Sequence, residues 1–302
     1  MVLATSCQPQ PRVEYIEGRA QGTTFHVTLY EAPKADWTQR VGSWLQMYNR
    51  EASAWDEQST LSRYNRGDQV LSPVFEDLLD VTDHVVQLAD PYLEPNMGHL
   101  IEAWGFGVGE GYLTLSDTAR VDSLMALTYT QPMLNVNAYS QGHSVDILVD
   151  SLQAHGVSHA FVEVGGELRV MGRKPDGTPW VVGIEQPVES ASGELMAELK
   201  LQPGYALATS GNYRRFDVDP ETGQKYGHTL NAQTGWPART DLLSATMIGP
   251  TCAAADAMAT AVMSMGLDRA KTWLRSHPDW DAYLIYSDTT GAFKVWTTLD
   301  LK

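Results

Sequence analysis

Apolar residues recur at helical spacing in several separate stretches of the chain. The clearest stretch is Phe75–Leu88, whose apolar side chains fall on one face of a helix. Elsewhere a capping residue precedes an apolar stripe, or an apolar face runs up to a glycine, and both arrangements mark helix ends. These patterns predict further helices at Asp36–Tyr48, Ser116–Leu127, Ser144–His155 and Asp268–Arg275.

Alternation of apolar and polar residues predicts β-strands between these helices. Arg19–Tyr30 alternates clearly, with Phe25, Val27 and Leu29 on one face. Its length and pattern predict one strand. Further strands are expected at Ala160–Val164, Leu168–Met171, Trp180–Ile184, Leu195–Leu201 and Tyr205–Thr209, and a closing hairpin at Ala282–Tyr286 and Phe293–Thr298.

The stretch Thr251–Gly266 differs from the other helices because it is small, apolar and almost without charge. Its one carboxylate, Asp256, is followed one helical turn later by Thr260. Residues four apart lie on the same helix face. Two oxygen ligands so placed could hold a hard cation such as Mg²⁺. The alternative is a core helix whose aspartate is paired with a neighbouring side chain.

Charge narrows the range of functions. The 302 residues include 21 Lys and Arg against 37 Asp and Glu, a net charge of −16. So acidic a chain is poorly suited to nucleic acid, whose binding rests on basic side chains at the phosphates. The sequence contains no apolar run long enough to span a membrane. Its two cysteines, Cys7 and Cys252, do not form a disulfide scaffold.

Residues 1–16 have the composition of a tether. The segment Leu-Ala-Thr-Ser-Cys7 resembles the end of a bacterial lipoprotein signal, in which the cysteine becomes the lipidated first residue. A polar stretch containing Pro9 and Pro11 follows. The alternative is an ordinary chain terminus that carries a cysteine by chance.

Two other segments carry candidate chemistry. Gly165 and Gly166 lie between two predicted strands, where glycine permits a ligand to approach the backbone. The segments 208–215 and 226–237 are rich in hydroxyl groups and contain one histidine, His228. From its spacing alone, a single histidine is interpreted as structural.

Taken together, the motifs of this chain resemble those of the FAD:protein FMN transferase family, the ApbE-like flavin transferases of bacterial envelopes. The resemblance runs from Gly18 to the C-terminus, and the motifs occur in the family's order. They are Gly18-x-Ala-x-Gly-Thr-Thr, Ser53-x-Trp, Ser59-x-x-Ser-Arg-x-Asn65, Leu100-x-x-x-Trp-Gly-Phe106-Gly, Asn137-Ala-x-x-Gln-Gly-x-x-Val-Asp146, Val164-Gly-Gly-Glu167, Pro175-Asp-Gly-x-Pro-Trp180, Gly183-Ile-Glu-x-Pro187, residues 208–215, His228-x-x-Asn-x-x-Thr-Gly-x-Pro237 and Ala255-Asp-Ala-x-Ala-Thr260.

The resemblance implies a reaction in which a threonine hydroxyl of a target protein attacks the pyrophosphate of FAD. FMN is joined to that threonine by a phosphoester bond, AMP leaves, and Mg²⁺ is required because charge develops on the phosphate oxygens. By the same resemblance, Asp256, Thr260 and the Ala138 carbonyl bind the metal. His228 matches the family's histidine near the reacting phosphates, where it would activate or orient the acceptor hydroxyl.

Other family positions imply contacts with FAD. Gln21 stands where the family usually has Met, Asn135 where it has Asp, and Gln141 where it has Lys. Glu94-Pro-Asn96 replaces the usual Asp-x-Thr. The residues expected to bind FAD are Gln21, Trp55, Ala103, Trp104, Gly105, Asn135, Gln141 and Thr229.

The family's fold class is α+β, a single catalytic unit of two closely packed subdomains with mixed or antiparallel sheets flanked by helices. We therefore expect a lipoprotein-like tether at 1–16 and the catalytic domain at 17–302. The expected partners are FAD, acceptor flavoprotein subunits carrying the target threonine, and the membrane surface through a lipid on Cys7. The expected location is the periplasmic side of the bacterial envelope. Two alternatives remain: a Mg²⁺-dependent FAD pyrophosphatase, and a lipoprotein that binds flavin or glycans without catalysis.

Overall fold

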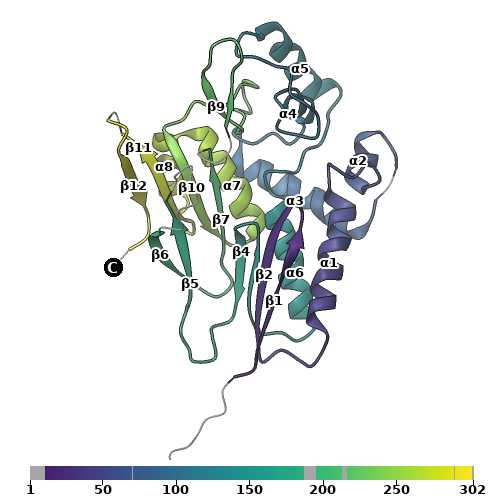
Figure 1. Cartoon of the computed structure of the whole chain (residues 1–302), viewed down its shortest axis with the longest axis vertical. Helices are drawn as coiled ribbons and strands as arrows, with labels where there is room; N and C mark the ends of the chain where they lie inside the picture. Colours follow the sequence, from purple (N-terminus) through teal and green to yellow (C-terminus); the bar gives the residue numbers. More distant parts are fainter. Residues whose placement is uncertain (1–10, 70, 187–194, 213–215, 289, 301–302) are drawn as a thin grey trace, which may run out of the picture.

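The computed structural model describes residues 11–69, 71–186, 195–212, 216–288 and 290–300. An eight-stranded sheet crosses the molecule in the order β1-β2-β3-β4-β7-β10-β11-β12, and every neighbouring pair is antiparallel (Figure 1). These strands are β1 (Val13–Ala20), β2 (Thr23–Tyr30), β3 (His159–Val164), β4 (Glu167–Met171), β7 (Ala206–Gly211), β10 (Leu242–Gly249), β11 (Asp281–Ser287) and β12 (Phe293–Thr297).

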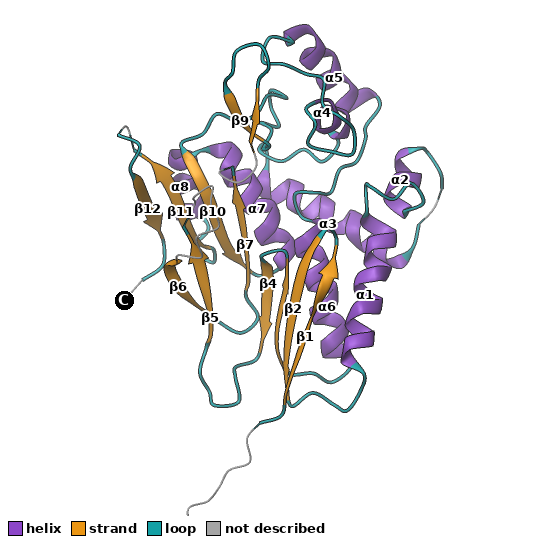
Figure 2. Ribbon diagram, in the orientation of Figure 1, coloured by secondary structure: helices purple, strands orange, loops and turns teal. Residues whose placement is uncertain are grey.

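Helices cover one face of this sheet (Figure 2). The helix α1 contacts β1, α6 contacts β3 and β4, α7 contacts β7 and β10, and α8 contacts β11. Four further helices complete the helical part of the described chain. The helices are α1 (Trp37–Ala52), α2 (Thr60–Asn65), α3 (Pro73–Ala89), α4 (Gly98–Ala103), α5 (Thr118–Thr130), α6 (Ser140–Ala154), α7 (Cys252–Met265) and α8 (Leu267–Ser276).

Two small hairpins lie outside the main sheet. The pair β5 (Trp180–Glu185) and β6 (Leu195–Leu201) covers the other face, where its apolar side chains pack against β4, β7 and β11. The pair β8 (Phe216–Val218) and β9 (Lys225–Gly227) joins α4 and α5 in a separate upper lobe with its own apolar cluster (Figure 1). This lobe is the second subdomain that the resemblance implied.

The helix α7 lies at the centre of the molecule because its side chains are small. It contacts α3, α6, β7 and β10. Thr251 begins it as an N-cap, accepting a hydrogen bond from the Ala254 N–H. Gly142 of α6 approaches its first turn so closely that a Cβ atom there would collide with the Cys252 carbonyl. Glycine is therefore required at position 142, where the two helix starts meet.

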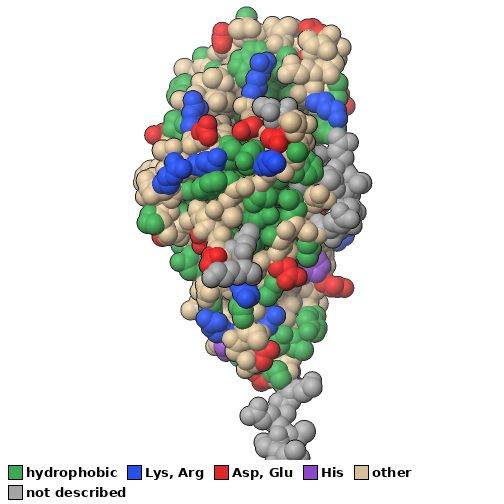
Figure 3. Space-filling view, turned by 90° about the vertical axis from the view of Figure 1, so that its left-hand side faces the viewer, with side chains coloured by type: hydrophobic (Ala, Val, Ile, Leu, Met, Phe, Trp, Pro, Cys, Tyr) green, Lys and Arg blue, Asp and Glu red, His purple; other side chains and the backbone are tan. Residues whose placement is uncertain are grey.

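The end of the sheet at β12 is partly apolar. Phe293 and Val295 are exposed on this strand, and Figure 3 shows apolar side chains lying among Lys and Arg side chains on this face of the molecule. Lys294 lies between them and forms an ion pair of 3.6 Å with Asp288. A charged side chain on an edge strand disfavours pairing with a strand of another molecule.

The structure confirms most predicted elements and corrects one of them. The single strand predicted at Arg19–Tyr30 is wrong, because the chain turns back at Gln21 and Gly22, whose φ angles are 51° and 74°. Two strands, β1 and β2, therefore form a hairpin here, and β1 starts at Val13. Residues 13–16 of the segment expected to be a tether therefore belong to the sheet. Cys7 lies outside the described residues.

Several elements had no clear signal in the sequence. The helices α2 and α4 are six residues long, which is too short for a periodic pattern. The strand β10 is buried on both faces and does not alternate. Among the helices that the structure describes, none has the length and hydrophobicity needed to cross a bilayer.

Candidate functional site

Asp256 lies in the second turn of α7 and is buried, with 7% of its surface exposed. One of its carboxylate oxygens accepts a hydrogen bond of 3.0 Å from the Gly142 N–H, at the start of α6. Burial raises the pKa of Asp256 to about 8; the Gly142 N–H opposes this rise, and the nearby charge of Asp146 adds to it. The carboxylate therefore lies in a place that disfavours its charge unless a cation is present.

Thr260 follows one turn later on α7 and is partly exposed. Its hydroxyl lies 3.2 Å from the Ser210 hydroxyl at the end of β7. Two residues further along the chain, the Asn212 side chain accepts a hydrogen bond of 3.2 Å from the Thr229 hydroxyl. The end of β7 thus connects the α7 face with the segment that carries His228.

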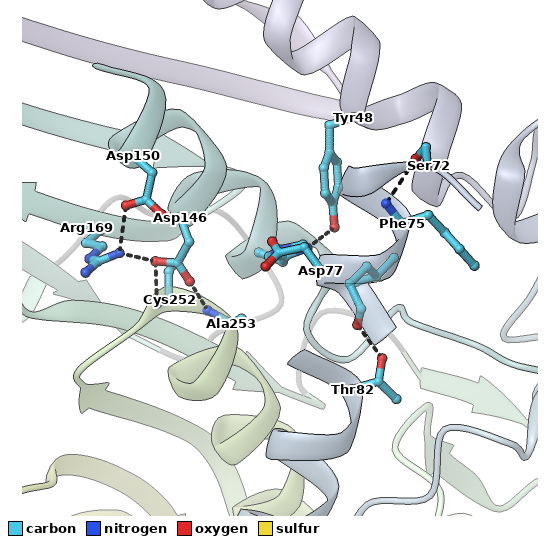
Figure 4. A network of polar contacts seen from close by, with 12 residues as sticks. Tyr48, Ser72, Phe75, Asp77, Thr82, Asp146, Asp150, Arg169, Cys252 and Ala253 are labelled. Carbon is cyan, nitrogen blue, oxygen red and sulfur yellow. Dashed lines mark hydrogen bonds and ion pairs between the residues drawn. The ribbon is translucent and has the colours of Figure 1, made fainter. Parts of the chain in front are cut away.

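Ala138 belongs to the loop that leads into α6, and three elements hold this loop in place. The Asn65 side chain makes two hydrogen bonds with the Leu134 backbone, of 2.8 and 2.9 Å. The Tyr139 hydroxyl lies 2.9 Å from the Thr82 hydroxyl of α3 (Figure 4). Ala138 itself packs in the apolar cluster that contains Ala257, the residue after Asp256. The loop is therefore fixed beside α7.

A buried histidine strengthens the start of α6. His143 is 2% exposed and lies between the Tyr48 hydroxyl, at 3.1 Å, and the Asp77 carboxylate, at 2.9 Å (Figure 4). Both nitrogens of its ring therefore have partners on α1 and α3. This network fixes the turn whose Gly142 N–H contacts Asp256.

A second buried carboxylate, Asp146, holds the first turn of α7. It accepts hydrogen bonds of 3.0 and 2.9 Å from the Cys252 and Ala253 N–H groups, and one of 2.8 Å from Arg169 (Figure 4). An anion at a helix start is favourable because the N–H groups there have no partners within the helix. Burial raises the pKa of Asp146, while Arg169 and the two N–H groups oppose that rise.

Two turns of the sheet meet near the same helix starts. The turn between β3 and β4 contains Gly165 and Gly166, whose φ angles are 65° and 108°. A Cβ atom on Gly165 would lie 2.6 Å from the Gln141 side-chain nitrogen and 3.2 Å from a Glu167 carboxylate oxygen. That Glu167 oxygen and the Gln21 side-chain nitrogen are buried and have no hydrogen-bond partner among the described residues. Buried polar atoms without partners are rare and mark positions that a ligand can satisfy.

The upper lobe contributes aromatic side chains. Trp104 is 2% exposed, donates a hydrogen bond of 2.9 Å to the Gly235 carbonyl and lies edge-on to Tyr226. His228 packs edge-on against Phe106, with ring centroids 6.3 Å apart. A cavity of about 320 Å³ opens beside this lobe, with Asn212, Tyr226 and Arg239 in its lining.

The structure brings together most of the residues predicted from the sequence, in two groups. Ala138, Gln141, Gly142 and Asp256 meet where α6 and α7 begin, next to the turns that carry Gln21 and Glu167. Ala103, Trp104, Gly105, His228 and Thr229 lie in or beside the upper lobe. Asn135 accepts a hydrogen bond from the Asn137 N–H within the Ala138 loop. Trp55 is 63% exposed, and its ring has no aromatic partner among the described residues.

Some residues of the site were not predicted. Asn65 and Glu167 belong to motifs of the resemblance, but neither had been assigned a role. The carboxylate that directly follows two glycines was the signal for Glu167. Ser210 lies in the hydroxyl-rich segment 208–215 but was not assigned a role. Asp77 and His143 had no signal in the sequence, since they are partners of each other from distant parts of the chain.

The donor set is suited to a hard cation. Along the first three turns of α7 lie the buried carboxylates of Asp146 and Asp256, the Thr260 hydroxyl and the Ala138 loop. Oxygen atoms are the ligands that Mg²⁺ prefers. In the described part of the chain, no group of three or more His, Cys, Asp or Glu side chains could hold a metal ion. A cation here would therefore need hydroxyl and carbonyl oxygens as well as carboxylates.

The raised pKa of Asp256 predicts an unusual dependence of stability on pH. In the folded protein Asp256 loses its proton only near pH 8, whereas an aspartate in the unfolded chain loses its proton near pH 4. Without a cation, the free energy of unfolding should therefore fall on the order of 3 kcal/mol between pH 5.5 and 8. Urea denaturation with a chelator at both pH values measures this fall. Asp256→Asn should remove the part of the fall that Asp256 causes, while the burial-raised pKa values of Asp146 and Glu167 leave a remainder. An unchanged slope in that variant would contradict the assignment.

Comparisons with known proteins match the chain to one family over most of its length. The family model described as "ApbE family" matches residues 21–284. The chain is 26% identical to a FAD:protein FMN transferase of Haemophilus influenzae, over 88% of this chain and 84% of that protein. It is 27% identical to one of Escherichia coli strain K12, over 98% of this chain and 92% of that protein.

Solved structures give the same picture of the fold. The apo crystal structure of Pseudomonas stutzeri flavinyl transferase ApbE matches with a TM-score of 0.83 and 26% identity, over 96% of this chain and 95% of that one. The flavin transferase ApbE from Vibrio cholerae matches with a TM-score of 0.79 and 24% identity, over 95% of this chain and 97% of that one. At that identity the second likeness concerns the fold alone.

Proposed function

The chain belongs to the ApbE family, and on this premise we propose that it transfers the FMN moiety of FAD to a threonine hydroxyl of a target protein. A phosphoester bond forms between FMN and the threonine, the pyrophosphate bond of FAD breaks, and AMP leaves. The observation that carries the proposal is the buried Asp256, whose carboxylate meets the start of α6 with Thr260 one turn further along α7. Relatives named FAD:protein FMN transferase support the same reaction class.

Three groups of this chain would hold Mg²⁺: the side chains of Asp256 and Thr260 and the carbonyl of Ala138. A bound Mg²⁺ would stabilise the negative charge that develops on the phosphate oxygens of FAD. The hydrogen bonds of Asn65 and Tyr139 keep the Ala138 loop in one position. Such preorganisation matters because a ligand that must first be ordered binds more weakly.

His228 would orient the acceptor threonine and take the proton of its hydroxyl. An imidazole suits this work because its ordinary pKa lies close to neutral pH. Its ring packs against Phe106, and the neighbouring Thr229 is held by Asn212. The side chains proposed to bind FAD are those of Gln21, Trp55, Ala103, Trp104, Asn135, Gln141 and Thr229, together with the backbone of Gly105.

The direct test mixes the protein with FAD, Mg²⁺ and an acceptor domain that contains a target threonine. We expect a covalently flavinylated acceptor, detected by mass spectrometry, and an equal amount of AMP. An acceptor with that threonine replaced by valine is the matched control and should stay unlabelled. AMP without any labelled acceptor would replace the transferase proposal with FAD hydrolysis. FAD binding without AMP would leave a flavin-binding protein.

We also propose that the protein works on the periplasmic side of a bacterial envelope, anchored by a lipid on Cys7. The support is the segment Leu-Ala-Thr-Ser-Cys7 and the polar stretch after it. Metabolic labelling of the full-length precursor with a fatty acid tests the anchor. Label should appear in the native protein and disappear in Cys7→Ser, and equal labelling of both would refute it.

A further inference from the structure

Glu167 carries a buried carboxylate oxygen without a partner. The residue is the first of β4 and is 7% exposed. Its Oε2 atom accepts no hydrogen bond from the described residues. Buried carboxylates are rare and are normally paired or hydrogen-bonded. The fold alone therefore gives no reason for this side chain.

The unpartnered oxygen faces the region where α6 and α7 begin. A Cβ atom on Gly165 would lie 3.2 Å from Glu167 Oε2 and 2.6 Å from the Gln141 side-chain nitrogen, so both atoms border the same small space. The next residue, Leu168, accepts a contact of 3.5 Å from the Cys252 thiol at the start of α7. Gln141 is followed directly by Gly142, whose N–H donates the 3.0 Å hydrogen bond to Asp256, so Glu167 and Asp256 both lie beside the start of α6.

The charges at this point are not balanced by the protein. Asp146 has Arg169 as its cationic partner, at 2.8 Å. Neither Asp256 nor Glu167 forms an ion pair with Lys or Arg among the described residues. Asp256 accepts one backbone hydrogen bond. Two buried negative charges without a cation are costly, and one divalent cation would compensate both.

We propose that Glu167 is the second carboxylate of the cation site, so that Mg²⁺ bound to Asp256 is held and neutralised by Glu167 as well. This inference rests on the proposed function, because it takes from it a cation at Asp256. It also accounts for Gly165, since any side chain there would fill the space between Gln141 and Glu167. The ligand class is a hard divalent cation, which takes oxygen ligands.

The test is a calorimetric titration of the full chain with Mg²⁺, without FAD, on the native protein and Glu167→Gln. The variant keeps the shape of the side chain and removes its charge. We expect its Mg²⁺ affinity to fall at least about tenfold, as is typical for charged groups around a bound metal. We also expect Mg²⁺ to raise its melting temperature less than that of the native protein.

Glu163→Gln is the matched control, because it removes the same charge from the same β-hairpin. Glu163 already contacts the Gly166 N–H and His26, at 2.6 Å each, so its carboxylate has partners. We expect its Mg²⁺ affinity to stay within about threefold of the native value, because the Gly166 N–H and His26 already hold this carboxylate. Melting curves without Mg²⁺ show whether each variant is folded.

The outcomes are separable. The inference would be overturned by any of three results. Folded Glu167→Gln could bind Mg²⁺ with native affinity, both variants could lose affinity equally, or the native protein could fail to bind Mg²⁺. AMP release by the native protein from FAD and acceptor is measured alongside. If AMP release fails while Mg²⁺ binding still depends on Glu167, the proposed function falls and the cation site stands.

Discussion

Replacing Asp256 with asparagine is expected to lower the rate of AMP release from FAD by at least about a thousandfold. The substitution keeps the size of the side chain and its contact with the Gly142 N–H, but it removes the charge that would hold Mg²⁺. Losing one preorganised electrostatic group at a reacting centre typically lowers the rate by a hundredfold to a thousandfold, and the lost cation adds to this. The rate is measured from AMP formed under saturating FAD and Mg²⁺.

The matched control for this experiment is Asp268→Asn. Asp268 lies in the first turn of α8 and is exposed, so its substitution removes an equal charge away from the site. We expect its rate of AMP release to stay within about twofold, because surface substitutions rarely have large effects. If Asp256→Asn retained a tenth or more of the native rate, Asp256 would have no part in binding the cation.

The largest loss of stability is expected from Arg169→Met. This change leaves Asp146 buried against the start of α7 without its positive partner. Breaking a buried ion pair on one side typically lowers the free energy of unfolding by about 3–5 kcal/mol. Urea denaturation monitored by tryptophan fluorescence measures the change.

Two further variants make the interpretation specific. Arg173→Met removes an exposed arginine whose contact is a 3.3 Å hydrogen bond to Gln202, and its stability should change by less than about 0.5 kcal/mol. Combining Arg169→Met with Asp146→Asn removes both charges, so part of the lost stability should return. A double variant less stable than Arg169→Met would show that the pair is not coupled in this way.

The predictions from sequence succeeded where local patterns were strong. The stretch Thr251–Gly266 was predicted as a helix, and α7 spans Cys252–Met265. The spacing of Asp256 and Thr260 was sufficient to place both on this helix, and the ordered set of motifs from Gly18 to the C-terminus was sufficient to name the family. The helix follows from residues that are close in the chain, and each motif is itself a short local pattern.

The elements and residues that the sequence did not predict depend mainly on contacts between segments that are distant in the chain. The strand β10 has seven buried residues of eight, so it shows no alternation from which a strand could be recognised. The turn at Gln21 is a backbone conformation that glutamine rarely adopts, which hid the hairpin. Glu167 follows two glycines in a motif of the family, but its role could not be predicted because its environment is created by α6 and α7, which lie on either side of it in the sequence.

The order of strands in the sheet has a consequence for how the chain reaches its fold. The hairpin β1–β2 pairs with β3, yet residues 31–158, with six of the helices, are made between them. At about 5–20 residues per second of synthesis, the open edge of β2 would wait on the order of ten seconds for its neighbour. Such non-local pairing slows folding and exposes an unpaired strand edge. The newly made chain should therefore be most prone to aggregate before residue 164 emerges, and a chaperone that shields this hairpin would act in that interval.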